Sequence, residues 1–291
     1  MWMRMRGAAA KLENKGGILS SSLSSTNRSP NQSTMFFASA LVSLLLASTA
    51  LGRPSIASRQ TRRRSGPLIP SKGPAANLIS NTTISHVKYS QNWAGASLES
   101  PSGTYTSVKG TFTVPTPKAR GSGSHAAAAW VGIDGDTCAT GIMQTGIDFT
   151  IDGSRTSYDA WYEYYPAASA DFSGFSVKAG DVITLVATKT SSTSGTVSIT
   201  NETTGKSVHK TLTGSHKLCG ENAEWIVEDF EEGSSLVPFA DFGTVTFTGA
   251  KATLASGGTV GPSGAQLLDI EQSSVLTSVS ATSDSVTIRY V

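Results

Sequence analysis

The sequence is poor in the residues that carry many familiar catalytic mechanisms. It contains two cysteines and four histidines among 291 residues. It lacks a G-x-S-x-G nucleophile elbow, an H-E-x-x-H zinc motif and the D-T-G loop of pepsin-like aspartic proteases. His125, His209 and His216 occur in polar, turn-like or alternating segments, which gives a Ser–His or Cys–His mechanism little support. Carboxylate chemistry is what remains.

Signals for bound groups are also scarce. The run Asp134-Gly135-Asp136 could begin a calcium loop, but the remaining ligands of an EF-hand are absent. Nothing indicates a nucleotide-binding loop. We therefore expect neither a metal ion nor a cofactor.

The long apolar run of the sequence lies near its start, in residues 35–52. This run falls short of the roughly 20 residues that span a bilayer, and it ends in small residues. Such a pattern is typical of a secretory signal peptide cleaved after Ala50 or Gly52, with a membrane anchor as the alternative. Residues 1–34 are an awkward extension before a signal, which favours a translation start at Met35. We expect a secreted, extracellular protein with no membrane attachment after processing.

Charge changes sign near Lys88. Eleven basic residues and one acidic residue precede it, a net charge of 11 − 1 = +10. Residues 88–291 hold 12 basic and 20 acidic residues, a net charge of 12 − 20 = −8, which argues against a nucleic-acid partner. The Pro-, Ser- and Arg-rich segment 53–87 should be disordered or only loosely docked. Its run Arg62-Arg63-Arg64 is either a processing site or part of a solvated linker.

The opposite charges suggest how the two parts interact. We hypothesise that segment 53–87 is a pro-segment, which covers an acidic cleft and inhibits the domain until low pH discharges the cleft.

Residues 88–291 have the pattern of one all-β domain. Short β-rich runs alternate with Gly, Ser, Thr and Asp turns, and no long stretch has a helical period. So many strands are expected to form two packed sheets. The predicted strands are 107–114, 127–133, 142–151, 157–165, 181–189, 195–201, 207–212, 223–230, 244–251, 265–272, 274–280 and 285–290.

Cys138 and Cys219 are the two cysteines. An even count in a secreted chain suggests a disulfide, and two free buried thiols are the alternative. Asn81 and Asn201 begin N-x-Thr sequons and are predicted glycosylation sites.

The stretch Asn222–Glu232, N-A-E-W-I-V-E-D-F-E-E, is the candidate centre of the domain. With period two, Glu224, Ile226 and Glu228 share one face of a strand. That face is either the floor of a polar cleft or the outer face of a solvated edge strand. Glu224 and Glu228 would lie about 13 Å apart along the strand. Glycosidases place their two carboxyl groups about 5–5.5 Å or 6.5–9.5 Å apart, so a sugar-cleaving site would need a second acid from another strand.

A disulfide would bring a second polar run close to this strand. Gln144 follows Cys138 by six residues, and Glu228 follows Cys219 by nine. If both strands leave the bridge in the same direction, the amide and the carboxylate can face each other across a cleft. Trp130 and Trp161 alternate with nearby acids, which indicates either a peptide- or sugar-binding groove or ordinary sandwich core.

Five longer motifs resemble the fungal glutamic peptidases, the eqolisins, over essentially all of residues 89–291. They are N-W-A-G (92–95), A-W-V-G-I-D-G-D-T-C (129–138), Q-T-G-x-D (144–148), Y-D-A-W-Y-E (158–163) and N-A-E-W-I-V-E-D-F (222–230). The resemblance implies an antiparallel two-sheet β-sandwich of the concanavalin-like jelly-roll type. It also implies a secreted acid endopeptidase, made as a precursor, without metal or cofactor.

The resemblance also implies roles for individual residues. Gln144 matches the catalytic glutamine, Glu228 matches the catalytic glutamate, and Cys138 and Cys219 match a family disulfide. Cleft positions are matched by Trp93, Trp130, Asp134, Asp148, Asp159, Trp161 and Glu163. The implied protein is a monomer that acts on proteins and peptides, with its own pro-segment as an inhibitor. The rival interpretations are a lectin-like, carbohydrate-binding sandwich that uses Trp93, Trp130 and Trp161, and a glycoside hydrolase.

Overall fold

The computed structural model describes residues 63–73 and 87–291, all within one unit, Gly52–Val291. These ranges contain strands and no helix, so they hold no helix that is long and apolar enough to cross a membrane. The expected extension 1–34, the signal peptide 35–52 and the sequon at Asn81 lie outside the described residues.

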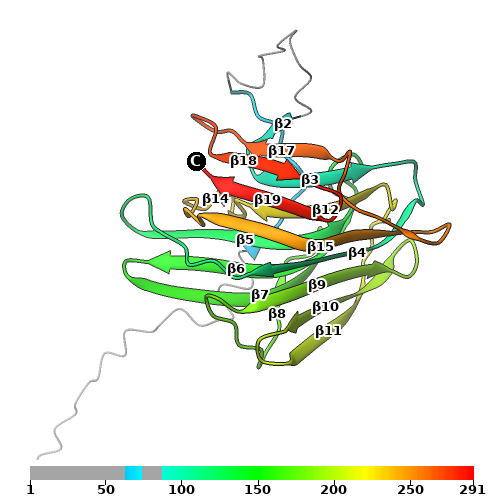
Figure 1. Cartoon of the computed structure of the whole chain (residues 1–291), viewed down its shortest axis with the longest axis horizontal. Coiled ribbons are helices and arrows are strands. Elements are labelled where there is room, and N and C mark those ends of the chain that lie inside the picture. Colours follow the sequence, from blue (N-terminus) through cyan, green and yellow to red (C-terminus); the bar gives the residue numbers. More distant parts are fainter. Residues whose placement is uncertain (1–62, 74–86) are drawn as a thin grey trace, which may run out of the picture. The chain divides into compact units, whose positions relative to one another are not determined.

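Two eight-stranded sheets pack face to face (Figure 1). We call them the site sheet and the back sheet. The site sheet has the order β2 (Val87–Ser90), β17 (Gln266–Ile270), β3 (Trp93–Glu99), β12 (Asn222–Glu228), β5 (Ser124–Ile133), β6 (Ile142–Asp152), β7 (Arg155–Tyr165) and β8 (Ala170–Asp171). The back sheet has the order β11 (Lys206–Thr213), β10 (Ser194–Asn201), β9 (Val182–Lys189), β4 (Tyr105–Thr113), β15 (Thr244–Leu254), β19 (Ser285–Tyr290) and β18 (Thr277–Ala281), with β16 (Thr259–Val260) on β15.

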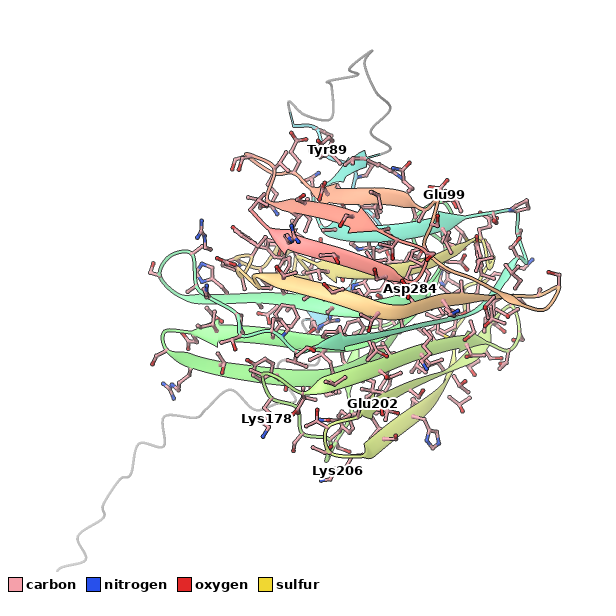
Figure 2. The ribbon with its side chains drawn as sticks, viewed as in Figure 1. Tyr89, Glu99, Lys178, Glu202, Lys206 and Asp284 are labelled. Atoms are coloured by element: carbon pink, nitrogen blue, oxygen red, sulfur yellow. A yellow bond between two sulfur atoms is a disulfide. The ribbon has the colours of Figure 1, made fainter. Side chains whose placement is uncertain are left out.

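Strand pairing is antiparallel in both sheets except between β2 and β17, which are parallel. A third, small sheet joins β1 (Arg63–Arg64), β13 (Glu231–Glu232) and β14 (Ser235–Leu236). The turn between β10 and β11 carries the exposed Glu202 (Figure 2). The predicted all-β sandwich is confirmed.

Strand β12 shows how the alternating sequence forms the core. Trp225 and Val227 point between the sheets, and the Trp225 indole donates to the Lys109 carbonyl oxygen at 2.8 Å. Glu224, Ile226 and Glu228 therefore face the other side of the site sheet. All seven residues of β12 are buried, and the strand lies between β3 and β5. The alternative of a solvated edge strand is wrong.

Every predicted run contains a strand, with ends that differ by a few residues. Strand β3, which pairs with β12, was not predicted. Its W-A-G-A-S-L-E sequence is rich in small residues and lacks β-branched ones, so its strand propensity is weak. Pairing with the neighbouring strands β12 and β17, and not its own propensity, accounts for this strand.

The predicted disulfide joins Cys138 to Cys219, with the Cα atoms 6.3 Å apart. Strands β6 and β12 are both antiparallel to β5, the strand between them. They therefore run in the same direction, as a cleft shared by Gln144 and Glu228 requires.

Candidate active site

The strand register arranges the outer face of the site sheet in rows that cross β12, β5, β6 and β7. One row holds Glu224, Gly132, Gln144 and Glu163. The next holds Ile226, Trp130, Gly146 and Trp161, and the third holds Glu228, Ala128, Asp148 and Asp159. Because side chains alternate along a strand, all three rows project to the same face. The alternation in the sequence predicted which side chains share a face of a strand. The strand register adds which of them are neighbours across the sheet.

Gly132 and Gly146 leave space for the tryptophan rings on the outer face of the site sheet. A Cβ atom on Gly146 would lie 2.6 Å from Cβ of Trp130 and 2.9 Å from Cζ2 of Trp161. One on Gly132 would lie 2.8 Å from Cζ3 of Trp130. These distances are too short for non-bonded carbon atoms. Both indole rings can therefore occupy these positions only because Gly132 and Gly146 have no side chain.

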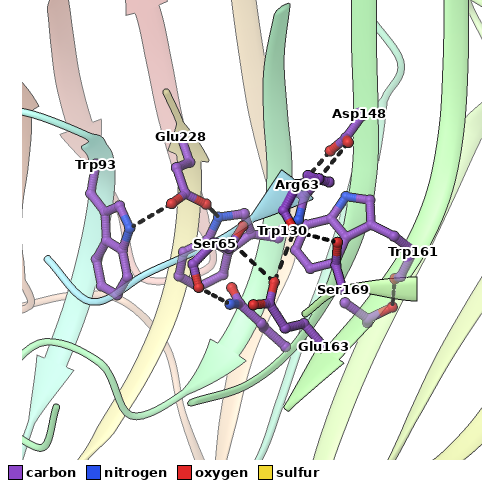
Figure 3. Close-up of polar contacts among 11 residues, drawn as sticks. Arg63, Ser65, Trp93, Trp130, Asp148, Trp161, Glu163, Ser169 and Glu228 are labelled. Atoms are coloured by element: carbon purple, nitrogen blue, oxygen red, sulfur yellow. Dashed lines mark hydrogen bonds and ion pairs between the residues drawn. The ribbon is translucent and has the colours of Figure 1, made fainter. Parts of the chain in front are cut away.

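Two indoles hold the Glu228 carboxyl group (Figure 3). Trp130 Nε1 donates to Oε2 at 2.9 Å, and Trp93 Nε1 donates to Oε1 at 3.3 Å. The two rings meet edge to face, with their centroids 4.9 Å apart. Burial raises the Glu228 pKa to about 7, although the Arg63 charge, the Ser65 hydroxyl and both indoles act to lower it. The carboxyl group is thus fixed in place and poised to exchange a proton.

Residues 63–73, which we call the docked segment, lie against these side chains. Gln144 Nε2 donates to the carbonyl oxygen of Ser65 at 3.1 Å. The Ser65 backbone N–H donates to Oε2 of Glu163, also at 3.1 Å. Ser65 has no exposed surface. Its backbone is thus held on both sides by side chains of the site row that contains Gln144.

Arg63 fills an acidic and aromatic pocket beside this point. Its Nε and Nη2 donate to the two carboxylate oxygens of Asp148 at 2.5 and 2.9 Å. The guanidinium carbon lies 3.8 Å from the ring centroid of Trp161 and 4.6 Å from that of Phe230. Nη1 lies 3.5 Å from Oε2 of Glu163. A bidentate pair stacked on an indole is a specific arginine site.

The docked segment continues across the cleft through backbone contacts. Arg63 and Arg64 pair with β13 as a short strand. Farther along, the Leu68 N–H donates to the Gly135 carbonyl oxygen at 3.1 Å. The Ile69 N–H donates to Oδ1 of Asn92 at 2.8 Å. This part of segment 53–87 is closely docked, contrary to the expectation of loose attachment.

Burial also changes the carboxyl groups around Arg63. It raises the pKa of Asp148 to about 6, against the lowering effect of the Arg63 charge. Burial raises the pKa of Glu163 to about 8, while Arg63 and the Ser65 N–H again act to lower it. Near neutral pH, Asp148 is therefore the carboxylate that chiefly balances Arg63.

Most of the predicted cleft residues meet at this site. Trp93 and Trp130 hold Glu228, Trp161 stacks on Arg63, and Asp148 and Glu163 bind the docked segment. Asp159 lines the hollow that holds Arg63.

Asp134 does not belong to this group. Its carboxylate accepts hydrogen bonds from the backbone N–H groups of Gly220, Glu221 and Asn222, at 2.8–3.2 Å. It has a positive φ of 67°, which permits this turn at the end of β5. Asp134 therefore braces the loop after Cys219, apart from the residues that surround Glu228 and the docked segment.

Asn201 is fully buried at the end of β10. Its Nδ2 atom donates to Asp181 at 2.8 Å, and its Oδ1 accepts from the Thr204 N–H at 3.1 Å. This burial counts against a glycan on Asn201 in the folded protein.

Two contacts of the docked segment were missed at the sequence level. Phe230 packs on Arg63, and Ser169 Oγ donates to the Arg63 carbonyl oxygen at 3.3 Å. Phe230 ends the motif that carries Glu228, so its position was a usable signal. Ser169, in a turn beside β8, offered none.

The outer face of the site sheet binds an extended segment of the chain through backbone and side-chain contacts. Such a site is typical of a peptide-binding protein. The model of the Peptidase A4 family matches residues 91–290. The chain belongs to this family.

Relatives and solved structures agree. The chain is 46% identical to Aspergillopepsin-2 of Aspergillus niger over 287 residues, 88% of this chain and 100% of the relative. It is 43% identical to Scytalidopepsin B of Scytalidium lignicola over 224 residues, 74% of this chain and 82% of the relative. A scytalido-glutamic peptidase crystal structure with a transition state analog inhibitor matches with a TM-score of 0.64 and 44% identity, over 69% of this chain and 98% of that one. Aspergilloglutamic peptidase from Aspergillus niger matches with a TM-score of 0.56 and 56% identity, over 57% and 99% of the two chains.

The resemblance inferred from the five motifs is thereby confirmed. The chain is a glutamic-type acid endopeptidase that hydrolyses peptide bonds.

Proposed function

We propose that Gln144 and Glu228 form the catalytic dyad of this peptidase. The observation that carries the proposal is their convergence on one residue of the docked segment, Ser65. Gln144 donates to the carbonyl oxygen of Ser65, and the Ser65 hydroxyl lies close enough to Glu228 to lower its pKa. A protein substrate in the same position would present its scissile carbonyl group to both side chains.

The two residue types suit amide hydrolysis in acid. Glu228 as a carboxylate takes a proton from water while the water oxygen attacks the carbonyl carbon. The Gln144 amide, which does not titrate, donates to the oxygen as it becomes negative. Glu228 then gives its proton to the departing nitrogen, and the C–N bond breaks. A histidine base would be protonated in acid and unable to act.

The acid range follows from the state of Glu228 without the docked segment. An unperturbed Glu has a pKa of about 4.3. The docked segment buries the carboxyl group, and burial is the main cause of the pKa of about 7. Departure of the segment therefore restores a base that is ionised in mild acid.

We further propose that segment 53–87 inhibits the peptidase as a pro-segment. Its docked part covers Gln144, occupies the Arg63 pocket and blocks access to Glu228, which is 1% exposed. The Arg63–Asp148 pair explains release in acid. Since the pair needs ionised Asp148, it weakens as the pH falls through about 6.

The rest of the proposal follows the sequence patterns. The protein is secreted to the extracellular space after removal of the signal 35–52, and the mature domain, residues 88–291, acts as a monomer. Asn81 remains a predicted glycosylation site.

One assay tests the catalytic proposal against its rivals. The activated protein is incubated with denatured albumin and, separately, with a polysaccharide at about pH 4, close to the ordinary Glu pKa of about 4.3, where part of Glu228 is ionised. We expect albumin fragments and an intact polysaccharide. Sugar release or intact albumin would contradict the proposal.

A second assay tests the pro-segment. A synthetic peptide of residues 53–87 is added to the mature domain at neutral pH, with residual cleavage of a small peptide as the readout. We expect inhibition that disappears in acid. No inhibition at neutral pH would end the idea.

A further inference from the structure

Ser65 presents its carbonyl group to the site in the way a substrate would. Gln144 donates to its oxygen at 3.1 Å, and Glu163 accepts from its N–H at 3.1 Å. Backbone contacts continue on both sides, through β1 before it and through Leu68 and Ile69 after it. The bond that follows this carbonyl group joins Ser65 to Gly66. If Gln144 and Glu228 are the dyad, this bond lies in the position of attack.

The side chain of Ser65 has an unusual environment. Its Oγ atom is buried and makes no hydrogen bond of good geometry within the described part of the chain. The same hydroxyl is among the groups that lower the Glu228 pKa, so it lies beside that carboxyl group. A carboxylate that acts as a base needs a water molecule at such a point.

A cavity lies next to this point. A cavity of about 210 Å³ is lined by Gly66, Pro67 and Glu228, among others. That volume is enough for several water molecules. Glu228 is nevertheless only 1% exposed, and each of its oxygens already accepts an indole N–H. The Ser65 hydroxyl and this cavity thus both adjoin Glu228.

We propose that Ser65–Gly66 is a potential self-cleavage bond, and that the Ser65 hydroxyl keeps it intact by occupying the place of the attacking water. The proposal rests on the Gln144/Glu228 dyad and on the role of the pro-segment. Removal of the hydroxyl admits a water molecule, whose oxygen bonds to the Ser65 carbonyl carbon as its proton passes to Glu228. The bond to the Gly66 nitrogen then breaks and that nitrogen receives the proton. The products carry a new carboxyl group at position 65 and a new amino group at Gly66.

The test uses the full chain with Ser65→Ala, which removes only the hydroxyl group. The protein is held just above the Glu228 pKa of about 7, where Glu228 is ionised and Asp148, with a pKa of about 6, still pairs with Arg63 and keeps the segment docked. Mass spectrometry follows the appearance of an amino terminus at Gly66. We expect the bond to break about 10²-fold faster than in the unaltered chain, because a positioned general base contributes about 10²–10⁴ in rate.

Four further variants make the test specific. Ser65→Thr keeps a hydroxyl group and should stay intact, whereas Ser65→Gly should be cut like Ser65→Ala. Ser71→Ala removes a hydroxyl that binds Glu271, outside the dyad, and should leave the bond intact. Ser65→Ala combined with Glu228→Gln should not be cut, which assigns the cleavage to the protein itself. The rate should not depend on protein concentration, because the bond lies in the same chain.

Two results would overturn the proposal. In one, Ser65→Ala and Ser65→Gly stay as intact at 65–66 as the unaltered chain, although each digests albumin after acid activation. In the other, Ser65→Thr is cut as fast as Ser65→Ala. Failure of albumin digestion by the unaltered chain would refute the proposed function instead, so the two failures can be told apart.

Discussion

Gln144 and Glu228 lie on strands that run in the same direction with β5 between them, two rows apart on one face of the site sheet. Neither side chain bonds to the other. They are related through Ser65, whose backbone carbonyl oxygen contacts the amide and whose side-chain hydroxyl lies beside the acid. In the proposed mechanism, the site is covered when residues 63–73 lie between these two side chains and open when the segment has left.

Arg63 should account for most of the affinity of the covered state. Truncating one member of a buried charge pair costs about 2–5 kcal/mol. At about 1.4 kcal/mol per tenfold change, Arg63→Ala should weaken inhibition by the 53–87 peptide at neutral pH by at least about tenfold. Inhibition constants measure this. Arg64→Ala removes the same charge from an exposed neighbour and is the matched control; equal effects of the two changes would mean that Arg63 acts only as a bulk charge.

Asp148 should set the pH at which the segment leaves. Its carboxylate is ionised above its pKa of about 6 and pairs with Arg63 there. Inhibition is therefore expected in full above that value and is lost as the pH falls through it. Asp148→Asn should weaken inhibition at neutral pH and flatten this dependence. The check is inhibition measured across a pH series, in which an unchanged midpoint in Asp148→Asn would contradict the assignment.

Glu224 should limit stability at neutral pH. Both of its carboxyl oxygens are buried and have no hydrogen-bond partner among residues 63–73 and 87–291. Burial, and then the charges of Asp134 and Asp136, raise its pKa well above 4.5. Because the folded state holds the proton more tightly than the unfolded state, stability is greatest below 4.5 and falls as the pH rises above it.

Glu224→Gln removes this ionisation. It should raise the melting temperature at neutral pH, change it little in acid, and affect cleavage far less than a change at Glu228. Melting curves against pH test this, with the exposed Glu202→Gln as the control. A drop in neutral-pH stability would count against the account.

Gly146 should be intolerant of a side chain. A Cβ atom there would lie 2.5 Å from the Ala129 carbonyl oxygen as well as against the Trp130 and Trp161 rings. Gly146→Ala should displace Trp130 from Glu228 and reduce acid cleavage of albumin. The exposed Gly153 has open space at its own Cβ position, but its φ of 61° favours glycine, so Gly153→Asn is the better control. Full activity in Gly146→Ala would show that the indole positions are not critical.

The sandwich and the pairing of Gln144 with Glu228 were predictable, because alternation assigns each side chain to a face and the disulfide relates two distant strands. Asp134 was not, since an acid at a strand end has the same sequence pattern whether it binds a ligand or braces a loop. Its three backbone donors come from residues 220–222, far away in the chain.

The docking of Ser65 was also hidden. Arg-Ser-Gly-Pro has the composition of a mobile linker, and its ordered state depends on the pocket and not on its own propensities. Charge alone indicated that the segment belongs near the acidic domain. The register along the cleft, with Arg63 on Asp148 and Ser65 on Gln144, required the structure.

Acid digestion of denatured albumin by purified Glu228→Gln protein tests the central claim most directly, with Gln144→Ala beside it and Glu202→Gln as a control. Loss of a single oxyanion donor costs about 10²–10³ in rate. We predict at least this loss for Gln144→Ala, no detectable cleavage by Glu228→Gln, and full activity in the control, with all three proteins folded. Full activity in Glu228→Gln would contradict the account.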